Sequence, residues 1–164
     1  MRWPRRQHPP PAPQDLDHGE RVIAAAPLDD GGTITVTTHR LIVDGPESVR
    51  CPWHLIDSGG YRPDRDELWA SFVDERPRQT WRISAPAQVP DAFRERVQAS
   101  VVLVERVDID RATSARVVLR KDLSDGALSV QVLYKDGADP DHPELRAGVA
   151  DSVTRLAEHV GREL

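Results

Sequence analysis

Apolar and polar residues alternate from position 33 to position 43, and this alternation is the clearest structural signal in the chain. Ile34 and Val36 fall on one face of an extended backbone, and the threonines beside them fall on the other. A second run, Arg40-Leu41-Ile42-Val43, follows after a very short connector. β-Branched residues with this period are typical of half-buried strands. The segment therefore predicts two adjacent antiparallel strands.

Short strands continue along the chain to about residue 84, and turn residues separate them. Asp29-Asp30-Gly31-Gly32 and Asp44-Gly45-Pro46 have the Asp, Gly and Pro content of tight turns. Pro52, within an alternating run over residues 48–55, favours an edge strand or a bulge. Seven strands are expected in this part, at residues 22–28, 33–37, 40–43, 48–55, near Tyr61, 68–73 and 80–84.

The hydrophobic period changes after residue 85, and the new period predicts a helix. Asp91 is a natural N-cap, and apolar residues recur at helical spacing after it. The end of this helix falls between Ser100 and Val107, because the β-branched residues there also favour a strand. The later elements are a hairpin of residues 115–123 and 128–135, turned by an Asp-Gly pair, and a helix from Asp141 to about Val160.

The segment Val36-Thr37-Thr38-His39-Arg40-Leu41-Ile42-Val43 resembles the Thr-x-x-Arg-Leu-Ile signature of bacterial pleckstrin-homology-like (PH-like) and GRAM-type domains. Seven antiparallel strands followed by one helix are also the layout of that superfamily. The resemblance covers about residues 19–107 and implies an α+β, mostly β fold: a seven-stranded antiparallel barrel or sandwich closed by a helix. Three further features support it, namely Gly19-Glu20-Arg21-Val22, Pro52-Trp53 followed by Ile56, and the helix Phe93-Arg94-Glu95-Arg96-Val97.

The chain is expected to divide into three parts. Residues 1–18 form a flexible tail rich in Pro and Arg, residues 19–107 form the PH-like barrel with its closing helix, and residues 108–164 form a β-hairpin and helix packed on the barrel. No apolar run approaches the roughly 20 residues of a membrane helix, and the amino terminus lacks the apolar stretch of a signal peptide. A single cysteine, Cys51, fits a reducing compartment. We therefore expect a cytoplasmic protein.

The charge distribution argues against two classes of ligand. The formal net charge is −5, and no basic stripe of the kind that binds nucleic acid stands out, so no nucleic-acid partner is expected. The resemblance implies that lipid-reading members of the family carry Lys and Arg in the connector between their first two strands. Here that connector contains Asp29 and Asp30, whose carboxylates repel phosphate. Phosphoinositide binding through this connector is therefore not expected.

The sequence offers no convincing catalytic or metal-binding motif. Cys51 and His54 are close in sequence, but strand alternation places them on opposite faces, with Cys51 as a small buried hydrophobe. A zinc site from His39, His54 and Cys51 would need a convergence that one meander does not provide. No Gly-rich phosphate loop follows a strand and opens a helix. We expect no enzymatic activity, no cofactor and no metal.

The tryptophans divide into core residues and one residue on a doubly apolar strand. Trp53 and Trp81 share faces with aliphatic residues and are expected in the core, whereas the strand of Trp69 is apolar on both faces. One face of that strand is expected to meet something outside the barrel, and the C-terminal extension is favoured over another chain. The function expected is a protein-interaction or scaffold module with an unknown protein partner, for which a second copy of the chain is one candidate. Two alternatives stay open: a small-ligand binder or enzyme with a pocket between barrel and C-terminal extension, and a peripheral membrane binder. The candidate interaction surface consists of Trp69, Tyr61, Arg62 and His54.

Overall fold

The computed structural model describes residues 10–74 and 76–160, which form three antiparallel sheets and two α-helices. The mostly β, α+β class expected from the sequence is thereby confirmed. The chain divides into two compact units, Met1–Val97 and Gln98–Leu164, which we call the N-terminal unit and the C-terminal unit. Each has its own sheets and its own helix packing.

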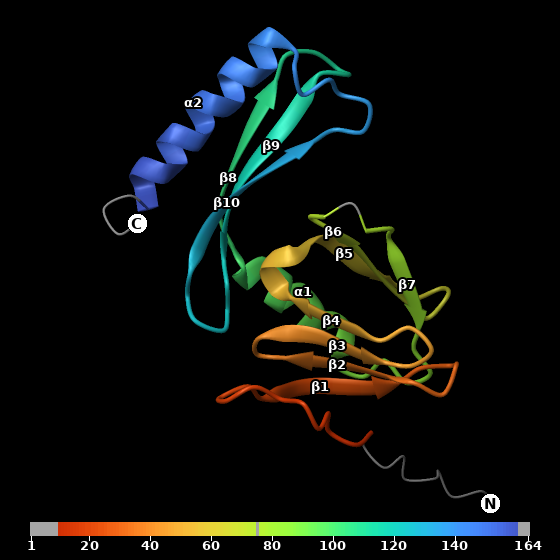
Figure 1. The fold of residues 1–164 in the computed structure, drawn as a ribbon. Helices are drawn as coiled ribbons and strands as arrows, with labels where there is room; N and C mark the ends of the chain where they lie inside the picture. Colours follow the sequence, from red (N-terminus) through yellow and green to blue (C-terminus); the bar gives the residue numbers. More distant parts are fainter. Residues whose placement is uncertain (1–9, 75, 161–164) are drawn as a thin grey trace, which may run out of the picture. The chain divides into compact units, whose positions relative to one another are not determined.

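The first four strands of the N-terminal unit form one antiparallel sheet in chain order (Figure 1): β1 (Val22–Pro27), β2 (Thr33–Thr37), β3 (Arg40–Asp44) and β4 (Val49–Pro52). Directly paired residues on neighbouring strands share a face of the sheet. Val36 pairs with Leu41, which pairs with Cys51, and all three side chains are fully buried. On the opposite face, Thr35 and its partner Ile42 are fully buried as well. The two predicted strands are therefore present, but the expectation that they are half-buried is wrong.

Three more strands form the second sheet of this unit: β5 (Ile56–Arg62), β6 (Glu67–Phe72) and β7 (Gln79–Arg82). A short 3-10 helix, Trp53–Leu55, connects β4 to β5. The two sheets meet at one corner, where Leu28 and Ile83 form an antiparallel bridge and the backbone N–H of Asp29 donates to the carbonyl of Arg82 (3.1 Å). The described strands thus make two sheets with a shared corner, without a closed barrel.

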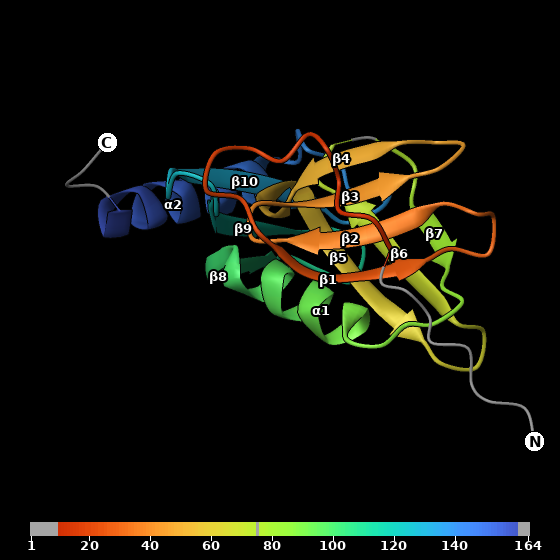
Figure 2. The same cartoon turned by 90° about the horizontal axis from the view of Figure 1, so that it is seen from below.

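Helix α1 (Val89–Ala99) packs against the junction between the two sheets (Figure 2). The Phe93 ring meets the Trp53 ring edge-on, with centroids 5.8 Å apart, and the Trp53 indole N–H donates to the carbonyl of Thr37 (2.9 Å). Gly59 on β5 makes room for this helix, because a Cβ there would lie 2.5 Å from a Phe93 ring carbon. Trp53 therefore links the first sheet to the helix.

The C-terminal unit places a helix along a three-stranded antiparallel sheet (Figure 1): β8 (Val101–Asp108), β9 (Ser114–Lys121), β10 (Leu128–Tyr134) and α2 (Pro143–Val160). Strand β9 lies in the centre of this sheet. One buried cluster joins sheet and helix, made of Val107, Ala115, Val117, Leu145, Val149 and Leu156. Neither α2 nor the other helix in the described part combines the length and apolar character that a membrane-spanning helix requires.

A glycine in α2 sets how closely the helix approaches the sheet. A Cβ on Gly148 would lie 2.5 Å from Cγ1 of Val107 on β8, far inside van der Waals contact. Gly148 therefore allows a contact that no other residue permits without movement. The predicted hairpin between β9 and β10 is confirmed, with Gly126 in the left-handed conformation (φ 82°) that its Asp-Gly turn requires.

The structure corrects the sequence-based boundaries in three places. Helix α1 begins at Val89, so Asp91 lies in its first turn and is not its N-cap. The first helix ends at Ala99, and residues 101–108 form β8. Their β-branched side chains favour an extended backbone, and this backbone pairs with β9. The hairpin expected after residue 108 thus forms a three-stranded sheet with β8, and the expected helix packs against this sheet. The run expected as one strand over residues 48–55 stops at Pro52 and turns into the 3-10 helix.

Candidate functional site

Glu20 connects the segment before β1 to the turn between β2 and β3. Its carboxylate accepts hydrogen bonds from the Thr37 hydroxyl (2.5 Å), the Arg40 guanidinium (3.1 Å) and the backbone N–H of Asp17 (2.8 Å). Burial raises the pKa of Glu20, but the hydrogen bonds from Thr37, Asp17 and Arg40 outweigh burial and hold the pKa below its ordinary value. Glu20 and the Thr-x-x-Arg motif residues Thr37 and Arg40 therefore together stabilise the turn between β2 and β3.

The segment before Glu20 is held near the turn between β3 and β4. Arg50 donates from Nε to Asp15 (2.7 Å) and from Nη2 to Asp44 (2.6 Å), so one guanidinium joins two carboxylates. The hydrogen bond from Arg50 lowers the pKa of Asp15. Arg40 also donates to the backbone carbonyl of Asp15 (2.6 Å). Of the tail expected from the sequence, residues 1–9 lie outside the described residues.

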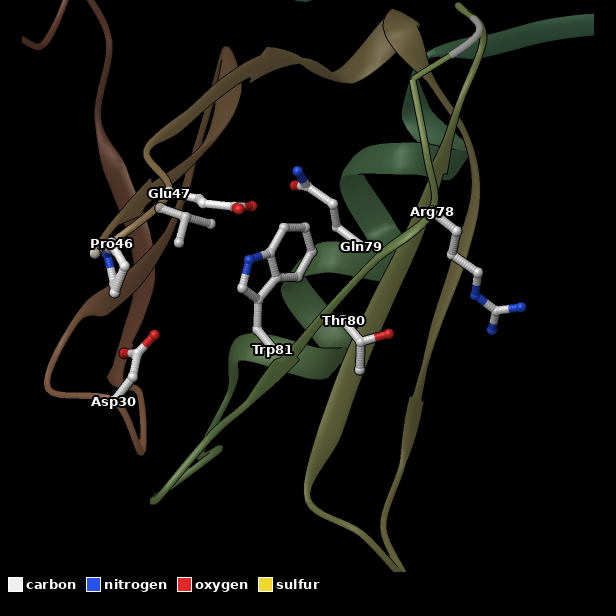
Figure 3. A pocket seen from close by; sticks show the side chains of 9 residues that line it. Asp30, Pro46, Glu47, Arg78, Gln79, Thr80 and Trp81 are labelled. Carbon is white, nitrogen blue, oxygen red and sulfur yellow. The ribbon is translucent and has the colours of Figure 1, made fainter.

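A pocket of about 410 Å³ opens between the two sheets of the N-terminal unit (Figure 3). The β1–β2 loop contributes Asp30, the end of β3 contributes Val43, and the β3–β4 turn contributes Pro46 and Glu47. The opposite wall is formed by residues 78–81. This volume lies within the range of roughly 300 to 1,000 Å³ that is usual for ligand sites.

Trp81 and Gln79 point from β7 into this pocket (Figure 3). In the ladder Trp81 pairs with Leu68 and Gln79 pairs with Ala70, and both partners are fully buried. Because paired residues share a face, Trp81 and Gln79 lie on the core side of the sheet. Trp81 is only half-buried, however, since the core is open here. The sequence correctly placed Trp81 on the core-facing side of its strand. The prediction that Trp81 is buried in the core is wrong, because its side chain is only half-buried.

The basic residue of the pocket wall points away from the cavity. Arg78 and Thr80 project to the opposite side of β7 in Figure 3. The guanidinium of Arg78 lies over the Trp69 ring, 3.8 Å from its centroid. This cation–π contact holds the positive charge on the outer face. The pocket itself therefore receives no positive side chain from β7.

The two charged side chains that face the pocket, Asp30 and Glu47, are both acidic. Within the described residues, no Arg, Lys or His nitrogen lies within 4.0 Å of the carboxylates of Asp30 and Glu47. One oxygen of Asp30 accepts the backbone N–H of Gly32 (2.9 Å). The amide oxygen of Gln79 is buried and lacks a hydrogen-bond partner in the described part. With the Trp81 ring, these groups form a site suited to a positive charge.

The residues grouped from the sequence as an interaction surface do not share one face. Gly60 pairs with Trp69, whereas Tyr61 pairs with Leu68, so Tyr61 and Trp69 lie on opposite faces of the second sheet. Arg62 shares the face of Trp69, and His54 lies in the 3-10 helix before β5. Sequence reasoning did not single out Gln79 or Glu47. Gln79 could have been identified because it lies two positions before Trp81, and residues two apart on a strand share a face. A polar residue on a core-facing side of a strand is unusual.

Cys51 lies in the core of the N-terminal unit, where the sequence placed it as a small buried hydrophobe. Cys51 is fully buried, and burial raises the pKa of its thiol to about 11. The potential ligand atoms that do come within 4.8 Å of one another belong to Asp17, Glu20 and His39 instead. The Glu20 oxygens there already accept hydrogen bonds from two side chains and a backbone N–H. We read this group as a hydrogen-bonded cluster that orders the turn.

Comparison with known proteins gives no relative for this chain: no protein-family model, no curated protein and no solved structure matches it. Its function is therefore inferred from the chemistry of its own residues. The pocket beside Trp81 is the feature that supports a specific inference.

Proposed function

We propose that this protein is a protein-interaction module whose N-terminal unit binds a cationic side chain of its partner. The binding site is the pocket between the β1–β2 loop, the β3–β4 turn and β7. The observation that carries this proposal is the combination of the Trp81 ring with Asp30 and Glu47, two carboxylates that no described basic residue neutralises.

The chemistry of the pocket favours a guanidinium over other groups. An aromatic face attracts a cation within about 6 Å of its centroid. Carboxylates bind the planar N–H fork of arginine in two-point contacts, and the unpaired oxygen of Gln79 can accept a further N–H. Val43 and Pro46 offer apolar contact to the alkyl stem of such a side chain. An exposed arginine in a partner segment is therefore the ligand group that suits the site best.

We further propose that the N-terminal unit is a PH-like domain in the form of an open sandwich. The succession of a four-stranded meander, a three-stranded sheet and a helix supports this assignment. So does the contact between Glu20 and Arg40, which joins two parts of the sequence pattern. Because one fold serves many functions, the charge of the pocket decides the ligand class here.

The same charge argues against an inositol phosphate ligand. Asp29 and Asp30 occupy the connector that would have to approach the phosphates, and Asp30 lines the pocket. We expect no co-sedimentation of the protein with phosphoinositide-containing liposomes through this connector. Binding that is lost when Asp29 and Asp30 are replaced would contradict the prediction.

A titration followed by NMR tests the proposed function on the full chain. The probe is N-acetyl-L-argininamide, and its neutral isostere N-acetyl-L-citrullinamide is the control ligand. We expect the arginine probe to shift the indole N–H signal of Trp81 and the side-chain amide signal of Gln79, with an affinity on the order of millimolar for one side chain. Equal shifts with the citrulline probe, or no shift with either, would overturn the proposal.

Three variants assign the effect to the pocket. Trp81→Ala should weaken binding of the arginine probe by about 2- to 30-fold, the equivalent of one cation–π contact. Glu47→Gln should weaken it by roughly two- to fivefold, as expected for an exposed ion pair. Glu95→Gln is the matched control, because it removes an exposed carboxylate on α1. The control should bind like the wild type.

A further inference from the structure

We infer that the partner presents its arginine on an extended segment, which pairs antiparallel with the free edge of β7 and becomes an additional strand of the second sheet. The inference rests on the proposed function, because the arginine of this segment enters the same pocket. Main-chain hydrogen bonds then add affinity, and the pocket selects one side chain of the segment.

One edge of β7 is free, because its one neighbouring strand in the described part of the chain is β6. The backbone N–H of Ile83 donates to the carbonyl of Asp66 (2.8 Å), directly before β6. The carbonyl of Arg82 instead accepts the N–H of Asp29 (3.1 Å) on the other side. Backbone groups of successive residues in an antiparallel strand point to alternate sides. The N–H and C=O of Thr80, two positions before Arg82, therefore point to the free side.

The protein's own chain already pairs with this edge at one end. Leu28 forms an antiparallel bridge with Ile83. The chain then turns back, and the N–H of Gly31 donates to the Leu28 carbonyl (3.1 Å). Among the described residues, no backbone hydrogen bond on this edge continues the pairing to Thr80. An extended segment of the partner can therefore continue the ladder along the rest of β7.

The free backbone edge of β7 also borders the pocket. Arg78 and Thr80 line the cavity, although their side chains project to the opposite side of the strand (Figure 3). These two residues therefore meet the cavity with main-chain atoms. A partner segment whose side chain fills the pocket has this free edge directly beside it.

The alternation of a paired strand decides which side chain of the segment enters the pocket. Residues directly opposite each other on neighbouring strands share a face of the sheet. The residue opposite Thr80 therefore points outward, away from the core. The next residue of the segment lies opposite Gln79 and points into the pocket beside Trp81. This second position is the place of the arginine.

The outer face of β7 adds a preference for the neighbouring position. Arg78 and Arg82 are exposed and lie on either side of Thr80, two positions away along the strand. Diagonal neighbours on adjacent strands are within reach of long side chains. An acidic residue opposite Thr80 therefore lies between two guanidinium groups. The segment that suits β7 best is an acidic residue followed by an arginine.

The test uses the peptide acetyl-Ala-Glu-Arg-Val-amide with the full chain. In the control peptide a methyl group replaces the backbone hydrogen of the glutamate, which removes the donor for the Thr80 carbonyl and leaves every side chain unchanged. We expect the first peptide to bind about 5- to 30-fold more tightly than N-acetyl-L-argininamide, the equivalent of one or two added hydrogen bonds. The methylated peptide should lose most of this gain.

Hydrogen exchange locates the segment on the protein. The first peptide should slow exchange of the Thr80 N–H, and the single-arginine probe should not. The amides of β10, an edge strand of the other unit, are the internal control and should exchange at an unchanged rate. A peptide with lysine in place of glutamate should bind roughly two- to fivefold more weakly, and equal binding would overturn the preference for an acidic residue.

The outcomes separate this inference from the proposed function. If N-acetyl-L-argininamide shifts the Trp81 signal, but both peptides bind equally and exchange of Thr80 is unchanged, the strand pairing is overturned while the proposed function stands. If neither the arginine probe nor the peptide shifts the Trp81 signal, both fall. Slower exchange along β4 or β10 instead of β7 would place the segment at another edge and overturn its assignment to β7.

Discussion

The two units of this chain close their cores in different ways. In the N-terminal unit two sheets enclose the core, share the Leu28–Ile83 corner and leave an opening beside the β3–β4 turn. In the C-terminal unit one helix lies along one sheet, and its buried residues follow the helix from Leu145 to Leu156. The first arrangement leaves core-facing residues at an open edge, whereas the second covers its sheet face with α2 from Leu145 to Leu156.

This difference explains where the candidate chemistry lies. A core-facing position at an open edge can hold a residue that is half-buried, as Trp81 is, with polar neighbours such as Gln79. The helix-covered face of the C-terminal unit holds aliphatic side chains instead. The comparison agrees with the proposal that places the ligand site in the N-terminal unit, whose core-facing strand β7 borders a pocket.

The largest effect is expected from Trp53→Ala in the N-terminal unit. Trp53 is fully buried, contacts Phe93 and bonds to the Thr37 carbonyl, so its removal should cost about 3 to 5 kcal/mol of unfolding free energy. Hydrogen exchange should show lost protection in β1 to β7 with protection retained in β8 to β10. Equal loss in both sets of strands would show one cooperative core and remove the contrast between the units.

A glycine substitution probes the sealed core. In an exposed helix, replacing Gly by Ala stabilises by up to about 1 kcal/mol, but Gly148→Ala should destabilise the C-terminal unit by about 1 to 3 kcal/mol. The reason is the contact of 2.5 Å that its Cβ would make with Val107. Urea unfolding measures the effect. The double variant with Val107→Ala should recover part of the loss, and a purely additive result would contradict the steric explanation.

Cys51 gives the N-terminal unit a pH dependence that the other unit lacks, since it is the single cysteine of the chain. Burial raises the pKa of its thiol from 9.0 to about 11. Between these values the unfolded chain loses the proton and the folded chain keeps it, so the unfolding free energy should fall as the pH rises from 9.0 to 11. The expected loss is on the order of 2 kcal/mol.

Cys51→Ala is the control for this loss, because other groups that titrate in the same range remain in the variant. The stability difference between wild type and variant should narrow as the pH rises. Native Cys51 should also react slowly with a thiol reagent at neutral pH. Rapid reaction would show that the thiol is accessible and would contradict its place in the core.

The smallest effect is expected from Arg155→Gln in the C-terminal unit. Arg155 donates to Glu105 (2.8 Å), but its side chain is 58% exposed, and water screens such pairs. Thermal unfolding should be close to that of the wild type and of Arg94→Gln, a matched exposed arginine of the N-terminal unit. A large decrease in the unfolding temperature would show that this ion pair, in addition to the buried cluster, holds α2 on its sheet.

Local patterns were sufficient to predict several elements. The alternation around Ile34 and Val36 identified β2, and the Asp125-Gly126 pair identified the β9–β10 hairpin, because each signal lies within the element itself. Strand β8 was missed because valines at helical spacing also carry β-branched side chains. Its strand character depends on pairing with β9, which begins at Ser114 and is not visible in the sequence of β8 itself.

The candidate site was harder to predict than the fold. Alternation placed Trp81 and Ile83 on the core side, which agrees with the pairing of Trp81 with the buried Leu68. Whether that side is enclosed or open depends on the β3–β4 turn, which lies more than 30 positions earlier in the chain. Glu47 in that turn was therefore not singled out from the sequence.

The corner that joins the two sheets also sets the order in which the N-terminal unit can be completed. The hydroxyl of Ser84 donates to Asp29 (2.6 Å) across a separation of 55 positions, beside the Leu28–Ile83 bridge. Contacts between residues far apart in sequence form slowly, because a long loop must close before they contribute. During synthesis β1 to β4 leave the ribosome before β7. The corner between the two sheets therefore cannot form until β7, the strand that carries Trp81, has been made. The pocket beside Trp81 is thus completed late in folding.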